Sequence, residues 1–374
     1  MERPWCCRFF PTPPVAVEER NGGDAIVNER TSAVSSGWSE KAQDAMDRKV
    51  KPPGSLGRLE ALAVRLAVLQ ETLEPRMDHG RILIFAADHG VTVEGVSAYP
   101  REVTAQMVRT FSSGGAAITV LARTLGLEVE VVDVGVDAEL PELPGVVAAR
   151  VRRGSRNFVY EPAMNLEELE AALEAGRAAA RRAVEADAVG LGDMGIGNTT
   201  AASALLSALT GASPAETVGR GTGVDDRGLA VKRSVVEATL GLHTPCFSDP
   251  RSALAAVGGL EIAALAGAAM EAARLRRAVL VDGFISTVAA LAAVRLDPEI
   301  RPALFYSHRS AEAGHGLALA VLGASPLLDL GMRLGEGTGS ALAFPILKGA
   351  AAILREMATF AQAGVADRAD GGNP

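Results

Sequence analysis

Short apolar segments that alternate with helical ones constrain this chain more than any other feature. The segments lie at residues 81–86, 128–134, 188–192, 278–282 and 302–306. A short continuous apolar run such as 81–86 is typical of a strand buried on both faces of a parallel sheet. Because such strands alternate regularly with helical segments, we predict a three-layer α/β fold with a mostly parallel sheet and several loops meeting at one edge.

Composition narrows the class of protein. The chain has 374 residues, 48% of them hydrophobic, which is enough for a large core in one or two domains. A net charge of −8 without a basic stripe argues against a nucleic-acid partner. Three cysteines are too few for a disulfide framework, and zinc-type spacing is missing, so we expect no metal and a reducing cytoplasm. Charged residues interrupt the longest apolar runs, 253–273 and 278–296, so we expect no membrane segment.

The two ends of the chain differ from its middle. Residues 1–38 carry prolines and glycines without periodicity, and we expect a disordered extension there. A helix is predicted from Ser39 to Lys49, after which K-P-P-G-S (51–55) stops it and Ser55 is expected to cap the next helix. Another helix is predicted over 340–360.

The segment M-R-L-G-E-G-T-G (332–339) carries one acidic side chain on a backbone with three glycines. Glycine allows a ligand to approach the main chain, and free amides there can meet an anion. Glu336 is the only nearby side chain able to accept a proton. The pattern suits a catalytic base beside a phosphate site, and it is equally compatible with a turn that leads into a helix.

Polar residues also follow the predicted strand 81–86. Asp88 and His89 are candidate ligand-binding residues, because open α/β sheets bind ligands at the carboxyl ends of their strands. A hydrogen-bonded turn that only fixes the loop would use the same residues. Tyr99 and Met107 could line a flat apolar pocket or belong to the core.

A glycine-rich turn follows the strand 188–192 and precedes a helix, in the segment D-M-G-I-G-N-T-T (193–200). This order directs amide groups and a helix N-terminus at one point, which suits a phosphate monoester. The glycines match neither a dinucleotide fingerprint nor a P-loop. After a second glycine-rich loop at 219–226, Lys232 could reach a phosphate or be solvated like most lysines.

Six motifs, taken together, resemble one family. They are K-P-P-G-S-L-G-R-L-E (51–60), A-D-H-G-V (87–91), G-x-M-G-I-G-N-T-T (192–200), V-D-G-F-I-S (281–286), S-H-R-S-A-E (307–312) and M-R-L-G-E-G-T-G (332–339). In order and over about residues 40–360, they resemble the nicotinate-nucleotide:dimethylbenzimidazole phosphoribosyltransferases. That family transfers phosphoribose from nicotinate mononucleotide to 5,6-dimethylbenzimidazole, giving α-ribazole 5′-phosphate and nicotinate for cobalamin assembly.

The resemblance implies a fold, partners and site residues. It implies a homodimer, a large Rossmann-like domain over 80–339 and a small helical domain from 39–75 plus 340–362. It implies Glu336 as the general base. The implied phosphate and ribose contacts are Gly195, Gly197, Asn198, Thr199, Lys232, Ser310, Leu334 and Gly335, and the implied base pocket adds Tyr99, Met107 and Met194 to Asp88 and His89. No cofactor is expected.

One position departs from the family pattern. The acid after Gly192 is usually glutamate and here is Asp193, shorter by about 1.5 Å. A displacement of that size weakens any catalytic support that Asp193 would give to Glu336. The alternative function is a nucleotide-binding or base-binding regulator that kept the fold and lost the chemistry.

Overall fold

The computed structural model of this chain describes residues 31–221 and 223–366. These residues form two compact units. The large unit comprises residues 79–343, and the small unit combines residues 31–78 with 344–366. Residues 1–30, which hold most of the segment predicted as a disordered extension, lie outside the described residues.

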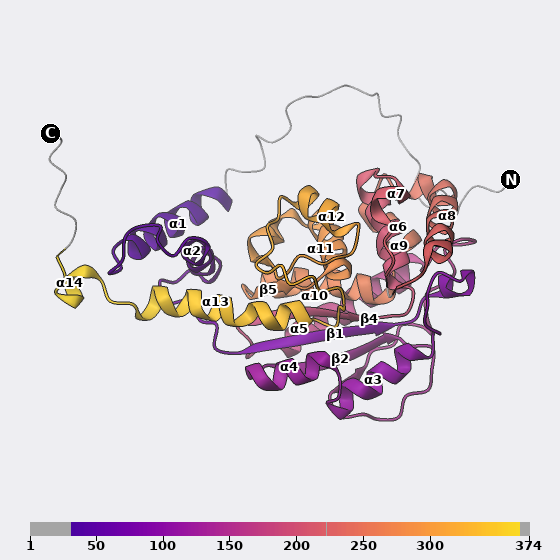
Figure 1. Ribbon diagram of the computed structural model, residues 1–374, viewed down its shortest axis with the longest axis horizontal. Coiled ribbons are helices and arrows are strands. Elements are labelled where there is room, and N and C mark those ends of the chain that lie inside the picture. The colour runs from indigo at the N-terminus through magenta and orange to yellow at the C-terminus, as the bar shows by residue number, and fades with distance from the viewer. Residues whose placement is uncertain (1–30, 222, 367–374) are drawn as a thin grey trace, which may run out of the picture. The chain divides into compact units, whose positions relative to one another are not determined.

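The large unit is built on a six-stranded sheet (Figure 1). Its strands are β1 (Gly80–Ala87), β2 (Glu128–Gly135), β3 (Val146–Ala148), β4 (Ala188–Met194), β5 (Ala278–Val281) and β6 (Leu304–Tyr306). They lie in the order β3-β2-β1-β4-β5-β6, and every neighbouring pair is parallel. The predicted parallel α/β fold is confirmed. The three-residue β3 was not predicted, because it is too short to show a periodic pattern.

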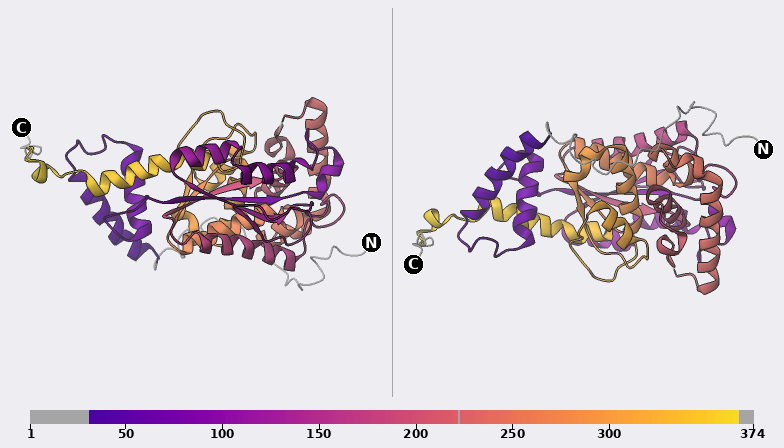
Figure 2. Two further views of the ribbon diagram at one scale, coloured as in Figure 1. Left: turned by 90° about the horizontal axis from the view of Figure 1, so that it is seen from below. Right: turned by 90° about the horizontal axis from the view of Figure 1, so that it is seen from above.

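Helices cover both faces of this sheet. Helices α3 (Val103–Ser113) and α4 (Ala117–Leu125) lie on one face, and α5 (Leu166–Arg182) lies on the other, as the left view of Figure 2 shows. Helix α10 (Leu260–Arg274) packs along α5 and also contacts β1, β2, β4 and β5. The other helices of the large unit are α6 (Asn198–Thr210), α7 (Pro214–Thr217), α8 (Asp226–His243), α9 (Pro250–Val257), α11 (Phe284–Leu296) and α12 (His315–Leu322).

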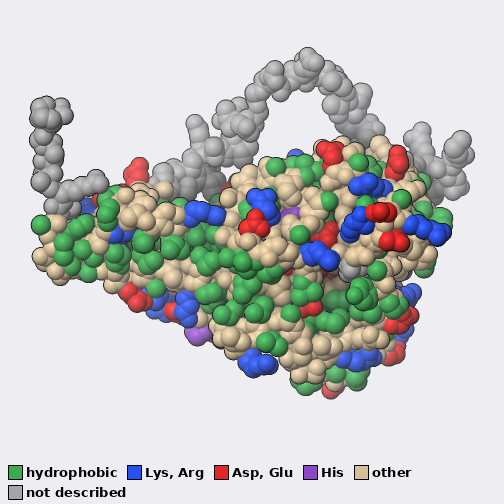
Figure 3. Space-filling model, viewed as in Figure 1, with side chains coloured by type: hydrophobic (Ala, Val, Ile, Leu, Met, Phe, Trp, Pro, Cys, Tyr) green, Lys and Arg blue, Asp and Glu red, His purple; other side chains and the backbone are tan. Residues whose placement is uncertain are grey.

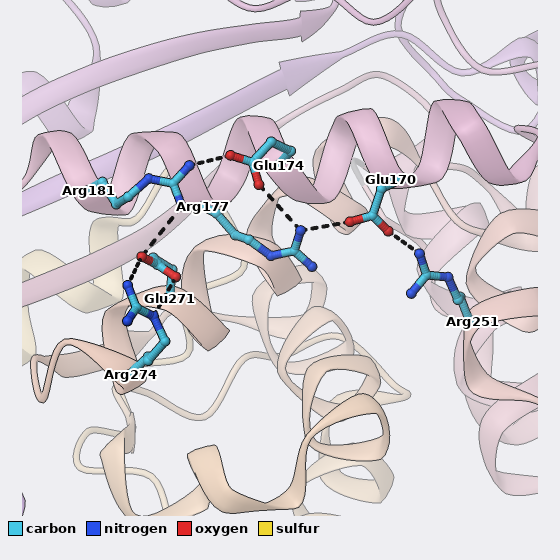
Figure 4. Close-up of polar contacts among 7 residues, drawn as sticks. All are labelled: Glu170, Glu174, Arg177, Arg181, Arg251, Glu271 and Arg274. Carbon is cyan, nitrogen blue, oxygen red and sulfur yellow. Dashed lines mark hydrogen bonds and ion pairs between the residues drawn. The ribbon is translucent and has the colours of Figure 1, made fainter.

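Helices α5 and α10 approach so closely that glycine is required at the crossing. A Cβ atom added to Gly176 would lie 1.8 Å from the carbonyl oxygen of Ala264, and one added to Gly267 would lie 2.0 Å from that of Leu173. The residues N-L-E-E (165–168) predict a capping box at the start of α5, and Asn165 and Glu168 form it. Ion pairs among Glu170, Glu174, Arg177, Arg181, Arg251, Glu271 and Arg274 line the outer side of this contact (Figure 4). All of these side chains except that of Glu271 are at least 26% exposed, and pairs between exposed groups contribute little, so the backbone contact dominates.

The small unit joins segments from both ends of the chain. Its helices are α1 (Thr31–Asp47), α2 (Arg58–Gln70), most of α13 (Thr338–Glu356) and α14 (Phe360–Ala363). The amide of Val50 donates to the carbonyl of Ala358 at 2.9 Å, and the Lys49 ammonium donates to the carbonyl of Met357 at 2.6 Å. Helix α1 begins at Thr31, eight residues before the predicted start at Ser39. The early start was not predicted, because Gly37 and the serines around it weaken the helical pattern in the sequence.

The K-P-P-G-S motif serves the small unit internally. Lys51 and Glu60 form a buried ion pair at 2.9 Å, and the Glu60 carboxylate also accepts the amides of Gly54 and Leu56. Helix α2 therefore begins at Arg58, with Gly57 as its N-cap. The prediction of Ser55 as the N-cap was wrong, because a side chain inside the helix satisfies the loop amides instead.

The surface agrees with the charge distribution in the sequence. No helix in the described part of the chain is long and apolar enough to cross a membrane. On the face drawn in Figure 3, basic and acidic side chains are interspersed rather than gathered into one basic stripe.

The crossing of α5 and α10 predicts the effect of one methyl group. Gly176→Ala should lower the free energy of unfolding by about 1–3 kcal/mol, because the helices must move apart to admit it. Gly241→Ala is the matched control, since Gly241 lies in α8 with no atom within 4 Å of an added Cβ, and it should be neutral or slightly stabilising. Chemical denaturation measures both, and equal effects would contradict the close-packing argument.

Candidate active site

The site lies at the carboxyl edge of the sheet, next to the boundary between β1 and β4. From β1 the chain continues to β2 and β3 on one side, whereas from β4 it continues to β5 and β6 on the other side. Doubly wound sheets bind ligands at the point where the strand order changes direction in this way. The loops after β4, β5 and β6, together with the turn before α13, surround a pocket of about 450 Å³. This volume suits a nucleotide-sized ligand.

Most of the predicted site residues line this pocket. They are Tyr99, Met107, Asp193, Met194, Gly195, Asn198, Thr199, Ser310, Leu334, Gly335 and Glu336. They come from segments as distant as residues 99 and 336, so only the fold brings them together. The pocket wall also contains residues that were not predicted individually, among them Phe284, His308, Glu312 and Arg333. Each belongs to a motif quoted above, which is the signal that could have identified them.

Asp88 and His89 do not line the pocket, contrary to prediction. Asp88 Oδ2 accepts the amide of Asp137 at 2.8 Å, which fixes the loop after β2. His89 Nε2 lies 2.8 Å from Glu261 Oε1, and both side chains are fully buried. A Cβ on Gly195 would lie 3.2 Å from His89 Nε2, so this pair supports the glycine turn from beneath. Ligand-binding and loop-fixing residues look alike after a strand, and here the second alternative holds.

The turn between β4 and α6 presents a helix N-terminus to the pocket. Gly197 has φ 97°, a conformation that favours glycine, and it is the N-cap of α6. It does not itself line the pocket; a Cβ there would lie 2.9 Å from Thr92. The side-chain amide of Asn198 donates to Asp193 Oδ2 at 2.9 Å, which ties the turn to the end of β4. The positive end of the helix dipole therefore meets the pocket at Asn198 and Thr199.

Lys232 of α8 stands behind the pocket wall. Its side chain is 1% exposed, and its ammonium donates to Thr199 Oγ1 at 2.9 Å. The backbone of Gly221 passes so close that a Cβ there would lie 2.9 Å from Nζ. Burial lowers the pKa of Lys232 to about 8, and Glu312 opposes this shift. The lysine is not among the wall residues, but it places a buried positive charge one hydroxyl group away from the pocket.

Glu336 occupies a strained turn. Gly335, Glu336 and Gly337 have φ angles of 85°, 64° and 87°, and a glutamate in this left-handed region costs energy. No hydrogen bond from the described residues reaches Glu336 Oε2, although it is buried. Burial raises the pKa of Glu336, and the Ile118 amide opposes the rise. A buried carboxyl group with one oxygen atom free of hydrogen bonds from the described residues, carried on a strained turn, is typical of a catalytic group.

Two other acidic residues adjoin this turn. Asp193 is buried, and its pKa is raised well above the usual value by burial first and then by the neighbouring carboxyls of Asp282, Glu261 and Glu336. Asp282 follows β5 and accepts the amides of Gly337, Gly339 and Ser340. Asp193 and Glu336 both line the pocket, and Asp282 holds the turn that carries Glu336.

Comparisons with known proteins agree with this geometry. Residues 31–365 match the model of a phosphoribosyltransferase family. The chain is 57% identical over 320 residues to a nicotinate-nucleotide–dimethylbenzimidazole phosphoribosyltransferase of Chromobacterium violaceum, with 85% of this chain and 93% of that protein covered. It is 54% identical over 333 residues to the enzyme of that name from Pseudomonas putida, with 88% and 94% covered. The crystal structure of CobT from Thermus thermophilus superposes with a TM-score of 0.85 at 49% identity, covering 88% of this chain and 99% of that one.

Proposed function

This chain belongs to the nicotinate-nucleotide–dimethylbenzimidazole phosphoribosyltransferase family, and we propose that the pocket beside Glu336 is its active site. The enzyme transfers 5-phosphoribose from nicotinate mononucleotide to 5,6-dimethylbenzimidazole in cobalamin biosynthesis. The products are α-ribazole 5′-phosphate and nicotinate. The observation that carries the site assignment is the buried carboxyl group of Glu336 on the pocket wall, whose Oε2 atom accepts no hydrogen bond from the described residues.

The chemistry requires one base and no general acid. Nicotinate leaves as a neutral ring nitrogen, so its departure removes the positive charge of the pyridinium linkage. The benzimidazole attacks with its unprotonated nitrogen and must lose the proton on the other one. A carboxylate within about 3 Å of that N–H takes it. Attack on the face opposite nicotinate converts the β linkage into an α linkage.

The phosphate of nicotinate mononucleotide would bind at the N-terminus of α6. Free amides there and the helix dipole favour an anion. Thr199 and Ser310 supply hydroxyl groups on the wall, the backbone near Leu334 and Gly335 supplies further contacts, and Lys232 supplies the charge behind Thr199. Anchoring the phosphate holds the ribose in line with both rings, and alignment of this kind supplies much of a rate enhancement.

The benzimidazole would lie against the apolar part of the wall. Tyr99, Met107 and Met194 provide a flat, polarisable surface, to which the structure adds Phe284. Asp193 is bonded to Asn198 and close to Gly335, so we assign it to fixing the turn rather than to proton transfer. A regulator without catalytic activity is not favoured, since the base and the anion site share one pocket.

Removal of the base should abolish turnover while binding survives. Glu336→Gln keeps the size of the side chain, so we expect the affinity for nicotinate mononucleotide to change little and kcat to fall about 10²–10⁴-fold. Chromatographic detection of nicotinate and calorimetric binding measure the two effects. Glu185→Gln, an exposed change at the surface, is the control. Near-normal kcat in Glu336→Gln would remove Glu336 from this role.

Charge at position 232 should control substrate affinity. Lys232→Met should raise the KM for nicotinate mononucleotide about 10–100-fold, because a charge-assisted contact is worth roughly 1.5–3 kcal/mol. The pKa of Lys232 is about 8, so its charge is present below pH 8 and lost as the pH rises through that value. KM should therefore rise between pH 7 and 9 in the wild type but not in Lys232→Arg. Lys348→Met, at an exposed position, is the control, and a flat wild-type profile would contradict the assignment.

We also propose a homodimer in the cytoplasm. Tyr99 and Leu334 line the pocket yet are 53% and 57% exposed, so a second chain over them would enclose the substrates. Charged nucleotides do not cross bilayers readily, which suits the cytoplasm. Light scattering should give a mass near twice 38.6 kDa, whereas a monomer at micromolar concentration would contradict the dimer.

A further inference from the structure

The carboxylate of Asp282 lies beneath the turn that carries Glu336. Asp282 follows β5 and is 1% exposed. Its Oδ2 atom accepts the amide of Gly337 at 3.0 Å. Its Oδ1 atom accepts the amides of Gly339 at 2.6 Å and Ser340 at 3.3 Å. One side chain therefore binds both the residue next to Glu336 and the first turn of α13.

These contacts fix a conformation that the turn would not keep alone. Glu336 and both its neighbours are left-handed, and such strain persists only where the surroundings hold it. On the other side, a Cβ on Gly192 of β4 would lie 2.6 Å from the carbonyl oxygen of Glu336. The turn is thus held between the main chain of β4 and the carboxylate after β5, which leaves its backbone little freedom.

Burial and hydrogen bonding act on the charge of Asp282 in opposite directions. His308 Nε2 lies 3.6 Å from Asp282 Oδ1, and the carboxyl groups of Asp193 and Glu336 are the acidic neighbours of Asp282. Burial raises the pKa of Asp282 to about 7, and the three amides oppose that rise. A Cβ on Gly339 would lie 2.6 Å from Oδ1, so glycine allows the close approach of α13.

We propose that Asp282 is a positioning residue for the transfer reaction, which orients the Glu336 carboxylate toward the incoming base by binding the amides of Gly337 and Gly339. This inference rests on the proposed role of Glu336 as general base. It assigns Asp282 no contact with substrate. Loss of Asp282 should therefore act on catalysis through Glu336 and leave the phosphate site intact.

Asp282→Asn tests the proposal, because the asparagine oxygen can still accept one backbone amide, whereas its NH2 group is a donor and cannot accept the other. We expect kcat to fall about 10–100-fold, as a misplacement near 1 Å does, with the KM for nicotinate mononucleotide within about threefold of wild type. Asp249→Asn is the matched control: Asp249 caps α9, also accepts two helix amides, and is not among the residues that line the pocket. It should leave kcat unchanged. If Asp282→Asn does not fold, Asp282→Ser is judged by the same criteria, because serine places no NH2 group against the backbone N–H groups.

A double-mutant cycle separates positioning from general stability. Glu336→Gln and the double variant Glu336→Gln/Asp282→Asn should have kcat values within about threefold of each other, because a displaced base and an absent base are equivalent. Multiplicative losses, or a normal kcat in folded Asp282→Asn, would overturn the positioning role. Normal turnover in Glu336→Gln alone would instead refute the general-base assignment, so the two failures can be told apart.

Discussion

Main-chain contact between β4 and the turn that carries Glu336 is the constraint on which this site depends. Gly192 has no side chain, so β4 can touch the carbonyl of Glu336 directly. The parallel order of the sheet places β5 beside β4, and Asp282 therefore meets the same turn. The position of a single carboxylate thus follows from two adjacent strands, which are among the most rigid elements of such a fold.

This arrangement costs stability. Burial raises the pKa values of Asp193, Asp282 and Glu336, so the folded state disfavours their ionised forms. Because the folded values lie above the unfolded ones, stability from these groups is greatest at acidic pH and declines as the pH rises through the folded values. The buried helix α10 and its close contact with α5 offset this cost at a distance from the pocket. Separation of a stable core from a strained site is common in enzymes.

Glycine has distinct physical roles in this chain. Gly176 and Gly267 allow two helices to touch, Gly197 supplies a left-handed cap, and Gly192 admits a neighbouring main chain. Of these four glycines, only Gly197 lies in a turn that the sequence marked as a candidate phosphate site. A glycine count therefore says little about function, whereas the atoms that a Cβ would meet distinguish packing from ligand approach.

The sequence by itself determined the parallel α/β fold and the capping box at Asn165, because periodicity and capping are local signals. An isolated acid among glycines is also a local signal, and it made Glu336 the candidate base. The sequence also marked Lys232 and the turn at 195–199 as anion-site candidates. Only the tertiary structure decided that Asp88 fixes the loop after β2 and that the pair of His89 and Glu261 supports the glycine turn from beneath. It also decided that Glu60 replaces Ser55 in satisfying loop amides, and that Asp282 holds the Glu336 turn. Each of those outcomes depends on partners 4 to 172 residues apart in the sequence. The residues next to a polar side chain in the sequence cannot show which distant amide or charge will be its hydrogen-bond partner. The partner is fixed by the order of the strands in the sheet and by how closely the chain packs.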